Sequence, residues 1–123
     1  MDKLEAIFCS NNKNATGRFI EAALLTLLNE EASHGYGLME SLENLGFDKD
    51  SVNSSIIYRN LRNMENRELI TSTWQESTQG PKKRIYEITS FGQEALAHWI
   101  ELLNNRRNRL TAIINYYDET KKR

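Results

Sequence analysis

The feature that most constrains the fold is a change of hydrophobic period near residue 70. Before it, apolar residues recur at helical spacing; after it, ITSTWQE and RIYEIT are rich in β-branched and aromatic residues. Gly80 and Pro81 lie between these two runs and favour a turn. Residues 70–89 therefore predict a β-hairpin that follows a helical region.

Three amphipathic helices are predicted before the hairpin. The first begins near Thr16, the second follows Ser33 as N-cap and ends at Gly46, and the third is capped by Asn53. Ile57, Leu61 and Met64 form the inner face of the third helix, while Leu38, Leu42 and Leu45 form that of the second. After the hairpin, Thr89 or a capping box of Ser90 and Gln93 begins a fourth helix from 91 to about 117.

The order helix, helix, helix, hairpin, long helix is that of a winged helix-turn-helix followed by a C-terminal helix. The predicted fold class is thus mainly α with a small β-hairpin. We expect an N-terminal arm or short helix over 1–15, a winged helix-turn-helix DNA-binding domain over 16–90, and a dimerisation helix and tail over 91–123.

Positive charge is local in this chain, whose net charge is only −1. Lys82, Lys83 and Arg84 lie at the predicted hairpin tip, and Arg59 and Arg62 lie on the third helix opposite its apolar residues. A solvated helix face is the ordinary alternative for such a ridge. Together with a basic hairpin, however, the ridge favours binding to double-stranded DNA, whose phosphates attract local basic patches.

The fourth helix carries an apolar seam at alternating spacings of four and three residues, interrupted at Arg107. Such a stripe is longer than a small core covers, so we expect it to form a homodimer interface. The predicted interface residues are Leu96, Ile100, Leu103, Leu110, Ile114 and Tyr117.

Other classes of function find little support in the sequence. Cys9 is the only cysteine, which excludes an internal disulfide and favours a buried apolar role, and His34 and His98 lack a third ligand at metal spacing. No catalytic or phosphate-binding motif is present, so we expect no enzyme activity, cofactor or metal. With neither a signal peptide nor an apolar stretch of membrane-spanning length, the sequence predicts a cytoplasmic protein without a membrane partner.

Three motifs resemble the PadR family of bacterial transcriptional regulators: HGYGLMESL at 34–42, IYRNLRNMENRELI at 57–70, and GPKKRIYEIT at 80–89. The resemblance covers roughly residues 18–118 and is closest to the family's smaller subgroup, which has one C-terminal helix. It implies a dimeric repressor that reads a palindromic operator, with Tyr58 on the DNA backbone. Many members have a Gly-Thr pair where this chain has Ser55 and Ile56, so the family's sequence preference does not carry over.

The resemblance also implies an effector site. Some PadR-like regulators bind flat aromatic compounds between tryptophans of the C-terminal helix, and Trp99 lies on that helix. Packing of Trp99 against the partner subunit is the alternative, and we hold the effector pocket as a hypothesis.

We therefore predict a DNA-binding transcriptional regulator, a dimeric repressor, and hold its release by a small aromatic ligand as a further hypothesis. The alternative is a winged-helix module that binds proteins and does not read DNA. The predicted DNA-binding residues are Ser54, Ser55, Tyr58, Arg59, Arg62, Lys82, Lys83 and Arg84.

Overall fold

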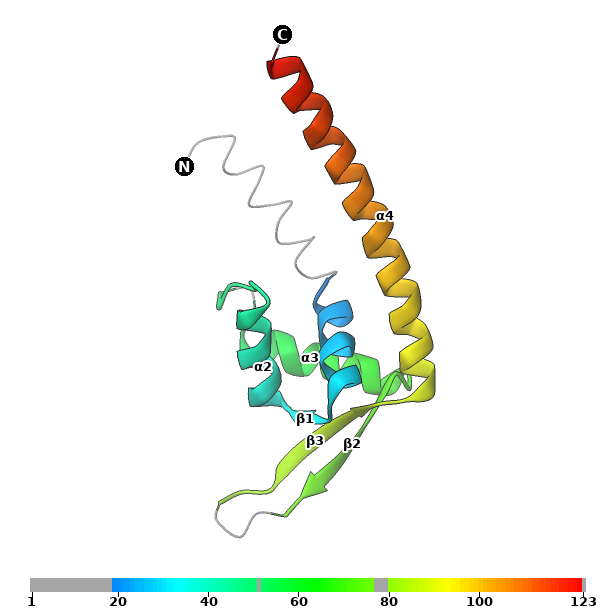
Figure 1. Cartoon of the computed structure of the whole chain (residues 1–123). Helices are drawn as coiled ribbons and strands as arrows, with labels where there is room; N and C mark the ends of the chain where they lie inside the picture. The colour runs from blue at the N-terminus through cyan, green and yellow to red at the C-terminus, as the bar shows by residue number, and fades with distance from the viewer. Residues whose placement is uncertain (1–18, 51, 77–79, 123) are drawn as a thin grey trace.

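The computed structural model describes residues 19–50, 52–76 and 80–122 (Figure 1). The predictions for the arm over 1–15, for Cys9 and for a helix start at Thr16 lie outside these residues. A first helix occupies residues 19–30. It is followed by β1 (Ser33–His34), α2 (Gly35–Asn44), α3 (Ser54–Asn66), β2 (Ile70–Gln75), β3 (Lys83–Ile88) and α4 (Ser90–Lys121). The predicted fold class, a mainly α winged helix with a long C-terminal helix, is confirmed.

The sheet has one more strand than the sequence predicted. Its order is β1-β3-β2, and all pairs are antiparallel. The two-residue strand β1 pairs Ser33 with Tyr86. In the hairpin, Ser72 pairs with Tyr86 and Trp74 with Arg84, so these side chains share one face of the sheet.

The core combines the first helix with the inner faces that the apolar periodicity predicted for α2 and α3, apart from Leu45. Leu24 and Leu25 of the first helix are fully buried, and the inner residues of α2 and α3 join them. No polar or charged side chain is buried among the described residues. The buried cluster consists of Ile20, Leu24, Leu25, Leu28, Leu38, Leu42, Val52, Ile57, Leu61, Met64, Leu69, Ile70, Tyr86 and Leu96.

Two of the predicted helix caps are present in the structure. Oδ1 of Asn53 accepts the backbone N–H of Ile56 at 3.0 Å, and Oγ1 of Thr89 accepts that of Gly92 at 2.9 Å. Each bond satisfies a donor that the first helical turn leaves free, which fixes the start of α3 and α4. The alternative start of α4, a capping box formed by Ser90 and Gln93, was wrong because Ser90 already lies in the helix.

The prediction of Ser33 as the cap of α2 was also wrong. Ser33 lies in β1, and Nδ1 of His34 accepts the backbone N–H of Gly37 at 3.2 Å instead. Both residues of β1 pair with β3 and the helix begins directly after this strand, so its last residue, His34, is the cap. Leu45, predicted on the apolar stripe of α2, lies beyond the helix and is exposed.

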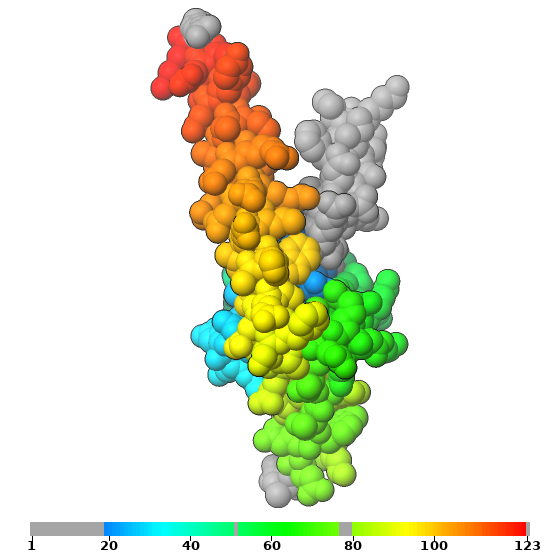
Figure 2. Space-filling view, turned by 90° about the vertical axis from the view of Figure 1, so that its right-hand side faces the viewer, coloured from blue at the N-terminus to red at the C-terminus, as the bar shows by residue number. Residues whose placement is uncertain are grey.

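Helix α4 is longer than predicted, with 32 residues or about 48 Å. Its first turns pack on the core through Gly92 and Leu96, and every residue from 104 to 122 is exposed. Figure 2 shows this half of α4 extending away from the globular part, on the side opposite the hairpin. Among the described residues no helix has the length and apolarity needed to cross a membrane.

Candidate nucleic-acid interface

Helix α3 exposes a polar and basic surface opposite its buried face. Ile57, Leu61 and Met64 are fully buried, which fixes the rotation of the helix about its axis. The residues on the other side line one surface hollow of about 490 Å³. These are Ser54, Ser55, Tyr58, Arg59 and Arg62, the five helix residues predicted to face DNA.

Tyr58 is held in place by the start of α2. A Cβ at Gly35 would lie only 2.4 Å from Oη of Tyr58 and 2.7 Å from Cζ, so the phenol ring packs directly on the glycine backbone. Tyr58 nevertheless keeps 36% of its surface exposed. Gly35 of the HGY motif therefore supplies a flat surface for the ring, while part of Tyr58 stays exposed.

Ile56 faces the other way. Its side chain is half-buried and packs against the core, and its carbonyl accepts Nδ2 of Asn60 at 2.9 Å. Ile56 is therefore less available to a base edge than its exposed neighbours. Ser54 and Ser55 are exposed in the first turn of α3.

The basic residues of the hairpin lie where β3 begins. Lys83 is exposed, and Nζ of Lys82 lies 3.8 Å from a carboxylate oxygen of Glu76 in an exposed ion pair. Such a pair contributes at most about 1 kcal/mol, so a phosphate can compete for the ammonium group. Both lysines are accessible at the end of the hairpin.

Arg84 has a different environment. Its Nε donates to Oγ of Ser72 at 2.8 Å, and its Nη2 lies 3.2 Å from Oε1 of Glu65 on α3. The guanidinium also lies over the rings of Trp74 and Tyr86, at 5.7 and 5.8 Å from their centroids. Ser72 in turn donates to Oε2 of Glu65 at 2.7 Å. Arg84 therefore connects the hairpin to α3, while 43% of its side chain stays exposed.

Tyr86 lies beneath this cluster. Burial raises the pKa of its phenol, and the nearby Arg84 charge opposes that rise. Neutral Tyr86 therefore forms the apolar floor on which the Arg84 guanidinium lies.

The predicted dimer residues divide between core and surface. Leu96 is buried against the domain and Leu103 is half-buried, whereas 58–60% of the surface of Leu110, Ile114 and Tyr117 is exposed. Ile113 and Tyr116 are exposed beside them and widen the apolar stripe. Large exposed apolar stripes of this kind mark interaction surfaces.

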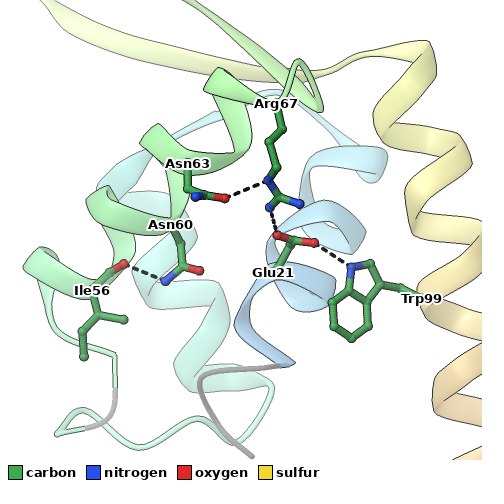
Figure 3. Close-up of polar contacts among 6 residues, drawn as sticks. All are labelled: Glu21, Ile56, Asn60, Asn63, Arg67 and Trp99. Carbon is green, nitrogen blue, oxygen red and sulfur yellow. Dashed lines mark hydrogen bonds and ion pairs between the residues drawn. The ribbon is translucent and has the colours of Figure 1, made fainter. Parts of the chain in front are cut away.

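Trp99 is half-buried between the core and a hollow on α4. Its indole Nε1 donates to Oε2 of Glu21 at 2.8 Å (Figure 3). One side of the residue packs on the core. A hollow of about 430 Å³ also borders it, lined by Phe91, Glu94, Ala95, His98, Trp99 and Leu102. His, Cys, Asp and Glu side chains form no group of three suited to a metal in the described parts of the chain.

Sequence reasoning missed the residues that position the groups predicted to face DNA. Glu65 and Ser72 bind Arg84, and Gly35 supports Tyr58. The hairpin pairing contained part of this signal, since it places Ser72 and Arg84 on one face. The contribution of Glu65 depends on how α3 packs against the hairpin, which no local pattern shows.

Comparisons with known proteins agree on one family. The model of the transcriptional regulator PadR-like family matches residues 24–98, which is more than half of the chain. The probable transcriptional regulator Rv1176c of Mycobacterium tuberculosis is 35% identical over 79 residues, which are 63% of this chain and 41% of the relative. The chain therefore aligns with less than half the length of that relative.

Solved structures show the same architecture. A PadR-like transcriptional regulator from Bacillus cereus superposes with a TM-score of 0.69 at 28% identity, over 78% of this chain and 91% of that one. A conserved protein described as a potential transcriptional factor gives a TM-score of 0.76 at 26% identity, over 88% and 95% of the two chains. The similarity thus extends well beyond the hairpin and its three helices.

Proposed function

The chain belongs to the PadR-like family of transcriptional regulators, and from that premise we propose that it is a homodimeric repressor of a palindromic DNA operator. One observation carries the proposal most directly. The five exposed residues of α3 line a single hollow, and the accessible lysines lie on the adjoining hairpin. A helix ridge with a basic hairpin beside it suits a major groove and its flanking phosphates.

The side chains have different roles in this proposal. Arg59 reads a base edge, since a bidentate guanidinium on guanine is the commonest specific contact. Tyr58, Lys82 and Lys83 bind phosphates and fix the register of the protein on the duplex. Ser54, Ser55 and Arg62 complete the helix surface. Arg84 contacts phosphate through its exposed part and holds the hairpin against Glu65.

The domain organisation follows from the same proposal. Residues 16–90 bind DNA, and residues 91–123 dimerise through the exposed apolar half of α4. A second copy covers the stripe that contains Leu110, Ile114 and Tyr117, which supports dimerisation because an uncovered stripe favours aggregation. Two copies also double the number of base and phosphate contacts, and two-fold symmetry explains a palindromic operator.

An aromatic effector is the further part of the proposal. The hollow beside Trp99 is lined by Phe91, Ala95 and Leu102, a largely apolar surface with an indole available for stacking. Binding there between two copies of α4 would release the DNA by favouring another spacing of the recognition helices.

The experiment compares Arg59→Ala with Lys83→Ala on an operator that the wild-type chain selects from a random pool. Arg59→Ala is expected to weaken operator binding by about 1–3 kcal/mol and to leave binding to scrambled DNA nearly unchanged. Lys83→Ala is expected to weaken binding to the operator and to scrambled DNA alike. It is also expected to reduce the slope of log affinity against log salt concentration by the equivalent of about one phosphate contact. Equal losses on both DNAs for both variants would contradict the division of roles.

Dimerisation is tested by light scattering on the variant Leu110→Asp with Ile114→Asp. A monomer that retains the helical content of the wild type is expected, and Thr111→Asp, an exposed residue between them, is the matched control. If the double variant stays dimeric, this face of α4 is not the interface.

A further inference from the structure

Glu21 connects two elements that carry different parts of the proposed function. It lies on the first helix, and only 16% of its side chain is exposed. Oε2 accepts the indole N–H of Trp99 on α4 at 2.8 Å, and Oε1 accepts Nη2 of Arg67 at the end of α3 (Figure 3). One carboxylate therefore binds both the recognition helix and the helix proposed to dimerise.

The contact at α3 extends into the helix itself. Arg67 is the C-cap of α3, and its backbone N–H donates to the carbonyl of Asn63. Its Nε donates to Oδ1 of the same Asn63 at 2.8 Å, so the guanidinium is bound on both sides. Two N–H groups in a planar fork leave a guanidinium little freedom, and the position of the C-terminal turn of α3 thus depends on Glu21.

The contact at α4 occurs just before that helix leaves the domain. Beyond Trp99, the guanidinium of Arg106 lies over the ring of Phe19 on the first helix, at 5.9 Å from its centroid. Residues 104–122 are all exposed. Because this part of α4 is a lever about 28 Å long, a small rotation at Trp99 becomes a large displacement at its end.

We propose that Glu21 is a positioning residue that couples the direction of α4 to the position of α3. The inference rests on the proposed function, in which α4 joins two copies and α3 reads DNA. In the dimer, Glu21 then fixes the separation of the two recognition helices. Whatever occupies the hollow beside Trp99, a second chain or a small aromatic molecule, acts on the same indole and so on the Arg67 contact.

The first test measures the coupling within one chain and needs no DNA. Nitroxide labels are placed at Arg62→Cys on α3 and Asn108→Cys on α4, with Cys9→Ser, and labelled chains are diluted with unlabelled ones. Glu21→Ala is expected to shift or broaden the distance distribution between the labels. Glu30→Ala, an exposed carboxylate on the same helix, is the matched control and is expected to leave it unchanged. An unchanged distribution in Glu21→Ala overturns the proposal.

The second test asks whether the coupling reaches DNA recognition. The readout is the ratio of the affinity for the selected operator to the affinity for scrambled DNA. A general loss of stability lowers both affinities alike and leaves this ratio unchanged. Glu21→Ala is expected to reduce this ratio about fivefold or more, the lower end of ordinary coupling between sites. A double-mutant cycle combines Arg67→Met with Trp99→Phe. Their effects on the logarithm of this ratio are expected to be non-additive when Glu21 is present and additive in the Glu21→Ala background.

The two proposals fail in different ways. If the wild-type chain selects no operator, the proposed function is wrong, whereas the label distances still decide the role of Glu21. If the wild type selects an operator but Glu21→Ala leaves the ratio of operator to scrambled-DNA affinity unchanged, the proposed coupling to DNA recognition is wrong. The same conclusion follows if the effects of Arg67→Met and Trp99→Phe are additive in both backgrounds.

Discussion

Replacing Gly35 with alanine is expected to displace Tyr58 from the surface proposed to bind DNA. The added Cβ would lie 2.4, 2.7 and 2.9 Å from Oη, Cζ and Cε1 of Tyr58, where ordinary contact begins at 3.4 Å. The hydroxyl must therefore withdraw by about 1 Å, and it can do so because the ring borders solvent. Gly35 has no positive φ, so alanine itself suits the helix. We expect the free energy of unfolding to change by less than about 1 kcal/mol.

DNA affinity is expected to fall much further. A hydrogen bond from Tyr58 to a phosphate contributes about 1.5–3 kcal/mol, since the acceptor is charged. Its loss corresponds to about 10- to 150-fold weaker binding, measured by fluorescence anisotropy on the selected operator. Chemical denaturation of the same sample checks that the fold is retained.

Gly37→Ala is the matched control on the same helix. Its Cβ would meet Oγ of Ser33 at 2.7 Å, the end of a side chain that can rotate away, and it has no contact with Tyr58. We expect wild-type affinity from this variant. If Tyr58→Phe weakens binding and Gly35→Ala does not, the argument that Gly35 positions the phenol is refuted.

Three further predictions concern stability. Gly92→Ala places a Cβ 2.0 Å from the backbone carbonyl oxygen of Leu69, which cannot move aside. Chemical denaturation should therefore show a decrease in the free energy of unfolding at the upper end of about 1–3 kcal/mol. Glu68 has φ of 63° in the turn that ends α3, so Glu68→Gly should relieve strain and add about 0.5–1 kcal/mol; a destabilised variant would contradict this. Burial raises the pKa of Tyr86 above its ordinary 10.0, so the unfolded chain loses this proton first as the pH rises. The stability that the neutral Tyr86 phenol contributes to the fold is fully present below pH 10.0 and is lost as the pH rises through the folded pKa. Denaturation at a series of alkaline pH values should therefore show a shallower decline in the free energy of unfolding for Tyr86→Phe than for the wild type.

Local physical chemistry accounts for most of the fold. Helical periodicity identified the buried faces of α2 and α3, because burial on one side of a helix imposes that spacing. The caps Asn53 and Thr89 follow from the four backbone N–H groups that each helix start leaves free. The change of hydrophobic period near residue 70 predicted the hairpin, and β2 and β3 pair with each other over Ile70–Gln75 and Lys83–Ile88.

Features that depend on tertiary contacts were not accessible in the same way. Two residues of β1 are too few to show a period, so their pairing with β3 was missed, and with it the role of His34 as cap. The bonds of Glu21 join residues 46 and 78 positions away in sequence. Such bonds require the packed arrangement of three helices, and a single acidic residue on an amphipathic helix gives no hint of it.

The central claim is that two copies of this chain read one symmetric DNA site. Selection of a random-sequence duplex pool by the wild-type chain, followed by sequencing of the bound fraction, tests it most directly. A two-fold symmetric sequence with half-sites about 10 base pairs apart, or a multiple of that spacing, is expected to be enriched. Enrichment of a single asymmetric half-site, or of no sequence at all, would contradict it.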